Sequence, residues 1–320
     1  MTASTKHLSV IVSPLTDPVR HGLTSSPKWL PSWLFYDAKG SSLFEQITEL
    51  PEYYLTRTER DILTRCTAEI VEAAGTPVTL VELGAGTATK THLIVTALLG
   101  RQLRLDYFPI DVSASALELA ANEMLRTFPQ VSVHPRIADY THGIAEVLSG
   151  KTRKLLLYLG SSIGNFDPAD ALELLRHVRD SLKPGDAMLL GTDLAKDGRI
   201  LVPAYDDADG VTAAFNKNIL ARLNRDLRAD FDLDAFRHAA VWNPSLSRIE
   251  MHLVSRKTQK VHIPDVDLEI SFLPGENIHT ENSYKYTLPQ VRELATASGF
   301  ELETTWTDSR RWFALHLLRA

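Results

Sequence analysis

Apolar and polar residues alternate along the middle of the chain with two different periods, which predict an ordered series of helices and strands. Apolar residues recur every four positions from Ile62 to Ala74, as on the buried face of a helix. Thr56 and Glu59 stand at the spacing of a capping box before this face, and Gly75 follows it as a stop. The pattern therefore predicts a helix from about Thr56 to Ala74.

Short apolar runs then alternate with segments of helical period up to residue 195. The runs predict strands at Val78–Leu83, Leu103–Asp111, Val131–Asp139, Lys154–Gly160 and Ala187–Asp193. The segments between them predict helices at Thr87–Leu99, Ser113–Thr127, Thr141–Leu148 and Pro168–Leu182. Asp167 before Pro168 is a favourable helix start, with Asp as the cap and Pro at the first helical position. Strands separated by helices indicate a mostly parallel sheet with helices on both faces.

The alternation breaks between residues 195 and 286, which indicates a second lobe. A helical pattern covers residues 207–228. Alternating apolar runs follow at Ile249–Val254, Val261–Ile263 and Leu268–Phe272, and they predict an antiparallel sheet.

The C-terminal segment returns to the first pattern. It predicts a helix at Pro289–Ser298 and strands at Phe300–Thr307 and Phe313–Leu318, joined by a short loop. A doubly wound α/β sheet of seven strands that ends in a β-hairpin is typical of class I methyltransferases, a Rossmann-like fold. We therefore expect such a domain from residues 55–195 and 287–320, and an inserted α+β substrate-binding lobe from residues 1–54 and 196–286.

Composition limits the class of protein. The 320 residues are 44% hydrophobic and 23% charged, which is enough apolar material for a sizeable core and excludes a disordered chain. The net charge is −6, and no run of basic residues offers a face for nucleic acid. The single cysteine, Cys66, cannot form an internal disulfide or a multi-thiolate zinc site, as expected in a reducing cytosol.

Apolar stretches are short throughout the chain. None approaches the roughly 20 residues of a membrane span, and the segment Leu8–Val12 is too short for the core of a signal peptide. The histidines show no spacing typical of metal ligands. We therefore expect a cytoplasmic protein, monomeric, with a small-molecule substrate and without a metal, a nucleic-acid partner or a membrane.

A glycine turn at the end of the first expected strand predicts a nucleotide site. Gly84 and Gly86 would let the backbone approach a ligand at the start of a helix. Thr89 stands where a dinucleotide-binding fingerprint needs its third glycine, so a pyrophosphate fits this turn poorly. Together with Glu82 before the turn, the pattern favours S-adenosylmethionine. Alone, it is also compatible with a structural turn in another α/β protein.

Two acidic residues end the next two expected strands at the edge where open α/β sheets bind ligands. Asp111 could accept both ribose hydroxyls, and Asp139 could accept the adenine amino group, with Tyr140 flanking the ring. Alternatively, the two carboxylates only cap the helices that begin at Ser113 and Thr141. The three strand-end signals together favour a nucleoside cofactor.

Longer motifs along the chain resemble the histidine Nα-methyltransferases of ergothioneine biosynthesis. The resemblance covers nearly the whole chain, except for about the first twenty residues. It is carried by Phe35–Ser41, Leu43-Phe44, Leu50–Tyr54, Thr56–Glu59, Gly84–Lys90, Gly160–Asn165, Gly191–Asp193, Tyr205–Asp207, Arg248–Met251 and Glu281–Ser283. Members of this family transfer three methyl groups from S-adenosylmethionine to the α-amine of histidine, and the product is hercynine.

The resemblance implies a role for particular residues of this chain. It implies cofactor contacts at Gly84, Gly86, Lys90, Asp111, Asp139 and Tyr140. It implies a substrate site made of Tyr53, Gly160, Asn165, Tyr205, Met251, Glu281, Asn282 and Ser283. Within that site, Tyr53, Asn165 and Tyr205 would lie near the carboxylate and the amine of the amino acid, with Tyr36 close to the amine, and Tyr36 and Asn165 are the expected catalytic residues. Glu281 and Ser283 would contact the imidazole beside Met251. The family commonly has Phe in place of Tyr140, and a phenol keeps the stacking face.

Structural roles remain open for several of these residues. Asn165 could be an ordinary turn residue, Glu281 a solvated loop residue and Lys90 a surface charge, while Met251 could belong to a core. The leading hypothesis is S-adenosylmethionine-dependent trimethylation of histidine, and the alternative within the same reaction is another amino acid such as tryptophan. An NAD-dependent oxidoreductase and a catalytically silent cofactor-binding module are the other classes. Thr89 argues against the oxidoreductase, and a full substrate lobe argues against the silent module.

Overall fold

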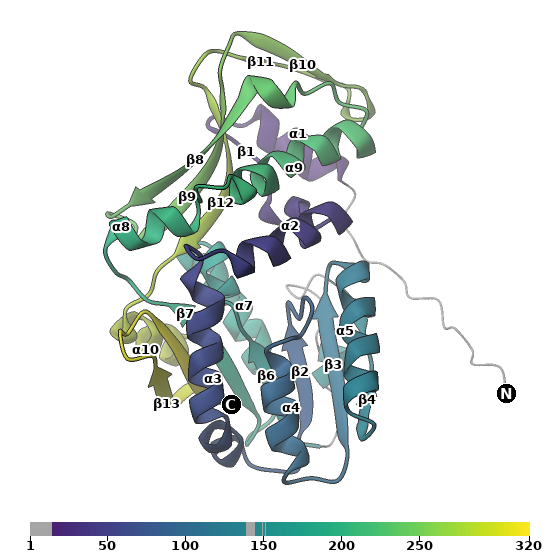
Figure 1. Ribbon diagram of the computed structural model, residues 1–320, viewed down its shortest axis with the longest axis vertical. Coiled ribbons are helices and arrows are strands. Elements are labelled where there is room, and N and C mark those ends of the chain that lie inside the picture. The colour runs from purple at the N-terminus through teal and green to yellow at the C-terminus, as the bar shows by residue number, and fades with distance from the viewer. Residues whose placement is uncertain (1–14, 139–144, 149, 151) are drawn as a thin grey trace, which may run out of the picture.

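The computed structural model describes residues 15–138, 145–148, 150 and 152–320. A large sheet with helices on both sides occupies the lower half of Figure 1. A four-stranded sheet and a two-stranded sheet lie above it with their own helices. The chain is therefore an α/β protein with a second α+β unit, as the sequence predicts.

The large sheet has the strand order β13-β14-β7-β6-β2-β3-β4, with β5 also paired to β3. Its central strands are parallel, whereas β14 runs antiparallel to β7, and β13 antiparallel to β14. The strands are β2 (Thr79–Leu83), β3 (Leu105–Asp111), β4 (Val131–Val133), β5 (Arg136–Ile137), β6 (Lys154–Tyr158), β7 (Ala187–Asp193), β13 (Glu301–Thr307) and β14 (Phe313–Arg319). The doubly wound sheet with a terminal hairpin is confirmed.

The edge of this sheet differs from the expectation in one detail. The predicted strand Val131–Asp139 is two short strands, β4 and β5, which pair with successive parts of β3. Pro135 lies between them and has no N–H to donate to a ladder. The eight strands therefore fill the seven expected positions.

Helices cover both faces of the large sheet because its strands are apolar on both sides. Leu155 and Leu157 of β6 pack into one core with α3, α4 and α5, whereas Leu156 and Tyr158 pack into another with α6, α7 and α10. The helices are α3 (Tyr54–Ala74), α4 (Thr91–Leu99), α5 (Ala114–Thr127), α6 (Ala145–Leu148), α7 (Pro168–Ser181) and α10 (Leu288–Ala297).

The upper unit combines the start of the chain with residues after β7. Its four-stranded sheet has the order β1-β12-β9-β8, so strand β1 near the N-terminus lies beside β12. Its strands are β1 (Lys28–Trp29), β8 (Phe236–Asn243), β9 (Arg248–Ser255), β10 (Gln259–Ile263), β11 (Leu268–Phe272) and β12 (Asn277–Tyr284). Its helices are α1 (Thr16–Thr24), α2 (Ala38–Glu49), α8 (Gly198–Leu201) and α9 (Val211–Asp226). Short 3-10 turns complete the chain at Ser32–Phe35, Ser162–Asn165, Val202–Ala204, Leu233–Ala235 and Pro264–Val266.

The prediction of an antiparallel sheet in this unit is confirmed in part. Strand β9 belongs to the four-stranded sheet, whereas β10 and β11 form a separate antiparallel pair. The sequence reasoning did not identify β8 or β12. No helix in the described ranges is long and apolar enough to cross a membrane.

Two predicted helix starts are wrong. Helix α3 begins at Tyr54 with Tyr53 as a cap that makes no side-chain bond, so the capping box of Thr56 and Glu59 does not form. Helix α4 begins at Thr91 rather than Thr87, because Ala88 has a φ of 54°, which a right-handed helix cannot contain.

Candidate functional site

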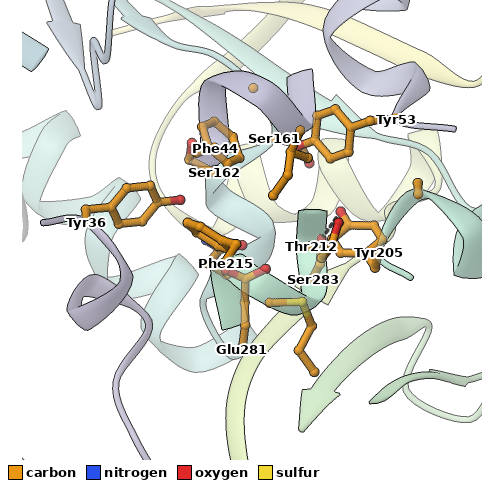
Figure 2. Close-up of a pocket in the computed structure, with 15 residues that line it drawn as sticks. Tyr36, Phe44, Tyr53, Ser161, Ser162, Tyr205, Thr212, Phe215, Glu281 and Ser283 are labelled. Atoms are coloured by element: carbon orange, nitrogen blue, oxygen red, sulfur yellow. Dashed lines mark hydrogen bonds between the residues drawn. The ribbon is translucent and has the colours of Figure 1, made fainter. Parts of the chain in front are cut away.

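A cavity lies between the loop that follows β6, the helices α2 and α9, and the strands β9 and β12 (Figure 2). It has about 520 Å³ of atom-free space, its open mouth included. Its lining is formed by Tyr36, Phe44, Ile47, Tyr53, Gly160, Ser161, Ser162, Asn165, Ala204, Tyr205, Thr212, Phe215, Met251, Glu281 and Ser283. The segments that contribute to it are far apart in the sequence, so only the folded chain forms this cavity.

Aromatic rings form one side of the cavity and support one another. Phe44 contacts Tyr36 edge to face at 5.9 Å between ring centroids and Tyr53 at 6.2 Å. Phe215 on α9 lies 5.9 Å from both Tyr36 and Phe44. Such mutual contacts hold the rings in place. The aromatic side can therefore receive an apolar or cationic group.

A β-bulge in β12 turns Glu281 into the cavity. His279 pairs with His252 of β9, but Glu281 pairs with Met251, so Thr280 is an additional residue on β12. An extra residue reverses the alternation of faces in a strand. Glu281 and Ser283 therefore point into the cavity (Figure 2). Met251, which pairs with Glu281 across the strands, lines the cavity as well.

Hydrogen bonds with neighbouring residues stabilise the bulge. The Thr280 hydroxyl donates to Asn216 Oδ1 at 2.8 Å and lies 3.0 Å from the carbonyl of Met251. The Asn216 amide donates to Nδ1 of His238, and Nε2 of His238 donates to the carbonyl of Tyr205, both at 2.8 Å. Burial lowers the pKa of His238, so a neutral ring fits this series of hydrogen bonds. These contacts connect the bulge to the backbone of Tyr205, which also lines the cavity.

The Glu281 carboxylate is buried without a hydrogen-bond donor among the described residues. Glu281 as a whole residue is 9% exposed. Burial raises its pKa to about 7, and the nearby charge of Lys285 opposes this effect. A buried carboxylate with free acceptor sites is costly unless a ligand supplies a donor. Glu281 is therefore suited to accept an N–H from a bound molecule.

Tyr205, Ser283 and Lys285 form a buried polar cluster beside Glu281. The Tyr205 and Ser283 oxygens are 2.7 Å apart, and the ammonium of Lys285 donates to Tyr205 at 2.8 Å and to Ser283 at 2.7 Å. Burial raises the pKa of Tyr205 far above its usual range, so its phenol stays protonated. This wall of the cavity therefore offers hydroxyl groups.

Asp193 at the end of β7 connects this cluster to the large sheet. Its carboxylate lies 2.8 Å from the ammonium of Lys285 and also accepts a bond from Lys196 and from the Tyr54 hydroxyl. Burial opposes ionisation, but the two lysines outweigh it and lower the pKa of Asp193. Burial lowers the pKa of Lys196 to about 8. These ionic contacts hold the cavity walls at a fixed position.

The loop after β6 brings Asn165 to the cavity. Ser161 adopts a left-handed conformation with a φ of 61°, and a short 3-10 turn follows it. Gly164 packs against β12 so closely that a Cβ would lie 2.8 Å from the carbonyl oxygen of Tyr284. The Asn165 amide makes no hydrogen bond to another described residue, so it is available to a ligand.

The loop after β2 and the end of β3 form a second polar region. Gly84 and Gly86 have φ values of 66° and 52°, and a Cβ on Gly86 would face open space. Asp111 accepts the Gly86 N–H at 2.9 Å on one oxygen and the Ser113 N–H at 2.8 Å on the other. Burial raises the pKa of Asp111, and these backbone bonds oppose that effect. Each oxygen keeps a second acceptor site.

Lys90 and Glu59 connect the two regions. The Glu59 carboxylate, which is fully buried, pairs with Lys90 and accepts the Gly160 N–H at 2.9 Å. It fits there because Gly191 has no side chain; a Cβ would lie 2.5 Å from a Glu59 oxygen. Lys90 is thus partnered and is not a free surface charge. Glu59 makes these contacts and does not take part in the expected capping box.

Comparison with known proteins identifies the family. A family model described as "Histidine-specific methyltransferase, SAM-dependent" matches residues 15–320. This chain belongs to that family. A histidine N-alpha-methyltransferase of Mycolicibacterium smegmatis is 47% identical over 93% of this chain and 92% of its own length. A protein of the same name from Mycobacterium tuberculosis is 44% identical over 93% of this chain and 92% of its own. The predicted family is confirmed.

A fungal relative extends the comparison. Ergothioneine biosynthesis protein 1 of Neurospora crassa is 30% identical over 91% of this chain, which corresponds to 33% of that longer protein. The matched region thus forms one part of the fungal protein.

The residues of this family member fit S-adenosylmethionine at the predicted edge of the sheet. Gly86 leaves open space at the turn, and the Asp111 oxygens keep acceptor sites for two hydroxyl groups. Glu82 does not face this region: its buried carboxylate accepts bonds from Thr91 and Tyr107. Burial raises the pKa of Glu82 to about 7. Glu82 therefore supports the loop from within the sheet.

The structure brings together most of the predicted substrate residues. Tyr36, Tyr53, Gly160, Asn165, Tyr205, Met251, Glu281 and Ser283 all line the cavity. Asn282 does not, because it follows Glu281 on β12 and points to the other face, where its amide donates to Asp167 at 3.1 Å. The predicted residues Asp139 and Tyr140 lie outside the described residues. The roles of the site residues stay predictions.

Sequence reasoning missed several cavity residues. They are Phe44, Ile47, Ser161, Ser162, Ala204, Thr212 and Phe215. Phe44, Ser161 and Ser162 lie inside the family motifs, so the motifs could have indicated them. Phe215 lies on an amphipathic helix whose apolar face looks like an ordinary core face. In the described part of the chain, no three potential metal ligands lie together.

Proposed function

We propose that this protein transfers three methyl groups from S-adenosylmethionine to the α-amino group of L-histidine and releases hercynine, the first step of ergothioneine biosynthesis. The observation that carries the proposal is Glu281: a buried carboxylate, without a hydrogen-bond donor in the described chain, directed into a cavity beside the nucleotide region. Membership of the histidine-specific methyltransferase family supports it. So do the relatives from mycobacteria and Neurospora.

Glu281 and Ser283 select the side chain in this proposal. A neutral imidazole has one N–H donor and one bare nitrogen acceptor. Glu281 accepts the N–H, and the hydroxyl of Ser283 donates to the bare nitrogen. An indole has an N–H but no acceptor nitrogen, so tryptophan, the alternative substrate, leaves the hydroxyl side unmatched.

Tyr36 and Asn165 act at the α-amine. A free α-amine is mostly protonated at neutral pH, and it must lose its proton before it attacks a carbon atom. The phenol oxygen of Tyr36 and the amide oxygen of Asn165 offer acceptors that bring no negative charge. They orient the lone pair and hold the amine in its attacking position, which is the main requirement of a displacement reaction.

The aromatic side of the cavity accommodates the products. Each transfer adds a methyl group, and the third leaves a permanent cation on the nitrogen. The faces of Tyr36, Phe44 and Phe215 attract such a cation by about 1 kcal/mol or more. These ring faces need no hydrogen bond from the ligand. A fully methylated nitrogen, which has no N–H, therefore leaves no polar group on them unpaired.

Gly84, Gly86, Lys90 and Asp111 hold S-adenosylmethionine, which supplies an electrophilic methyl group on a sulfonium. Asp111 binds the ribose hydroxyls with its free acceptor sites. Asp139 and Tyr140 remain the proposed adenine contacts. The reaction needs no metal in this proposal.

We also propose that residues 55–195 and 287–320 bind S-adenosylmethionine, while residues 1–54 and 196–286 bind the amino acid. The protein acts as a monomer in the cytoplasm in this proposal. The buried ion pairs of Asp193 with Lys196 and Lys285 support a fixed arrangement of the two units.

An assay with isotope-labelled S-adenosylmethionine and each of the twenty amino acids tests the function. We expect label in histidine alone, as a product with three added methyl groups in mass spectrometry. A thermal-shift screen with S-adenosylhomocysteine present should likewise detect stabilisation by histidine. Transfer to tryptophan, or to a macromolecule with histidine inert, would overturn the proposal.

A further inference from the structure

Helix α2 contacts the loops after β2 and β3, where the nucleotide region lies. Figure 1 shows this helix between the upper unit and the large sheet. Ser41 and Glu45 lie one turn apart on α2 and so share a face. The hydroxyl oxygens of Ser41 and Ser113 are 3.1 Å apart. The Thr87 hydroxyl donates to Oε1 of Glu45, also at 3.1 Å. One face of α2 therefore lies against both loops.

The Glu45 carboxylate keeps free acceptor sites at this contact. An ionised carboxylate has about four such sites, and the Thr87 hydroxyl occupies one of them. Glu45 makes no ion pair with another described residue. Burial raises the pKa of Glu45 and the charge of Glu49 adds to this effect, whereas the Thr87 bond and the charge of Lys90 oppose it. Lys90 thus lies within electrostatic reach of Glu45, although its ion pair is with Glu59.

The amino-acid tail of S-adenosylmethionine carries two opposite charges on one carbon atom. The carboxylate is the anionic group of this cofactor, so it is the group that the proposed contact with Lys90 fits best. The ammonium is bonded to the same carbon and lies directly beside the carboxylate. A charged group that leaves water is costly unless it is paired. The tail therefore needs an acidic side chain close to Lys90.

The other acidic side chains near this loop are already engaged. The side chain of Glu59 has no exposed surface and pairs with Lys90. Glu82 is buried in the large sheet, where it accepts two hydroxyl protons. Asp111 accepts two backbone N–H groups and is the proposed ribose ligand. Among these described carboxylates, the one that remains open to a ligand is Glu45.

We propose that Glu45 binds the ammonium group of the methionyl tail, while Lys90 binds its carboxylate. The inference rests on the proposed cofactor site and adds to it a residue from the unit that binds the amino acid. Two opposite charges then recognise a zwitterion. Phe44 and Ile47 of the same helix line the substrate cavity. Helix α2 therefore contacts both binding sites.

Four ligands separate the ammonium from the rest of the cofactor. S-adenosylhomocysteine has both charged groups of the tail. Its decarboxylated analogue keeps the ammonium, its deaminated analogue keeps the carboxylate, and methylthioadenosine has neither group. Calorimetry gives their dissociation constants for the wild-type chain and for Glu45→Met, whose unbranched apolar side chain suits a helix.

Loss of Glu45 should weaken only the ligands that carry the ammonium. In Glu45→Met we expect S-adenosylhomocysteine and its decarboxylated analogue to bind about tenfold or more weakly, because a hydrogen bond between charged groups is lost. The deaminated analogue and methylthioadenosine should not bind more weakly. Glu45→Gln should show a smaller loss for the first two ligands, because its amide oxygen still accepts. Equal weakening of all four ligands would show a merely structural contact and overturn the inference.

A matched control lies on the same helix. Glu49→Met removes an exposed carboxylate one turn further along α2 and should change none of the four dissociation constants. An unchanged affinity of Glu45→Met for S-adenosylhomocysteine overturns the inference. Absence of S-adenosylhomocysteine binding in the wild type overturns the proposed cofactor site instead. Methyl transfer to an amino acid other than histidine overturns the proposed function and leaves the assignment of Glu45 in place.

Discussion

The ammonium of Lys285 lies 2.8 Å from a carboxylate oxygen of Asp193, and both side chains are fully buried. Asp193 ends β7 of the large sheet, and Lys285 follows β12 of the four-stranded sheet. A buried ion pair with additional partners joins the two sheets directly behind the cavity. The geometry of the site therefore depends on charges that never reach solvent.

Removal of this charge should destabilise the fold. Asp193→Asn leaves Lys285 and Lys196 buried without their shared carboxylate, and breaking a buried pair in this way costs about 3–5 kcal/mol. We expect a decrease of that size in the free energy of unfolding measured with urea. Asp197→Asn is the control, because its pair with Arg199 is exposed and such pairs contribute about 0–1 kcal/mol. Equal stability of both variants would contradict the role of Asp193.

Glu281 should determine the affinity for histidine. Truncating one partner of a buried charged hydrogen bond costs about 2–5 kcal/mol, and 1.4 kcal/mol corresponds to a factor of ten. Glu281→Ala should raise the KM for histidine about 30-fold or more and leave the KM for S-adenosylmethionine nearly unchanged. Glu281→Gln should have a smaller effect, because its amide oxygen still accepts. Glu269→Gln, on an exposed pair, serves as the control, and an unaltered KM in Glu281→Ala would show that this carboxylate does not bind histidine.

Stability should depend on pH through the same carboxylate. The pKa of Glu281 is about 7 in the folded chain, against an ordinary value of 4.5. Between these values the folded chain holds a proton that the unfolded chain has lost, so stability decreases as the pH rises, by about 3 kcal/mol across the window. Glu281→Gln has no carboxyl group at this position, so it lacks this pH-dependent part of the stability. Urea unfolding at pH 4.5 and pH 8 should show a smaller decrease for the variant than for the wild type, and parallel decreases would contradict the burial argument.

The bulge at Thr280 should control both stability and substrate binding. Thr280→Val keeps the shape of the side chain but removes the proton donated to Asn216. A buried acceptor left unpaired costs about 1–3 kcal/mol. We expect that loss in urea unfolding, together with a higher KM for histidine and an unchanged KM for S-adenosylmethionine. Thr258→Val, at an exposed position, is the matched control; a stable variant with a normal KM would show that the bulge does not need this bond.

Substitution of Asp111 should weaken the binding of S-adenosylhomocysteine. Asp111→Asn keeps one oxygen for the backbone but loses the charge and one acceptor. Hydrogen bonds to charged groups contribute about 1.5–3 kcal/mol, so the dissociation constant of S-adenosylhomocysteine should rise about tenfold or more. Asp106→Asn on the same strand, where the side chain is exposed beside His134, should leave it unchanged. Calorimetry distinguishes the two, and equal affinities would remove Asp111 from the ribose contacts.

Much of the large sheet could be predicted from local patterns. Strands β6 and β7 are buried at every position and are mostly apolar, and Gly160 follows β6 whereas Asp193 ends β7, so the chain itself marks their ends. The position of Asp111 at the end of β3 followed from the same pattern. Glu59 could not be placed in this way, since its capping-box spacing indicated a local bond. Its carboxylate instead pairs with Lys90 and accepts the Gly160 N–H, which only the packing of α3 against the loops after β2 and β6 brings near.

The amino-acid sequence by itself determined the order of helices and strands, the glycine turn and the family motifs, because these depend on neighbouring residues and on side-chain types. Only the tertiary structure decided which motif residues face the cavity. One extra residue at Thr280 turns Glu281 and Ser283 inward and Asn282 outward, although all three belong to one motif. Lys285 likewise acquires its contacts from Tyr205 and Asp193, which are distant in the chain. Alternation along a strand is a local property, but the bulge that reverses it is stabilised by a contact with Asn216 on helix α9, which is distant in the sequence.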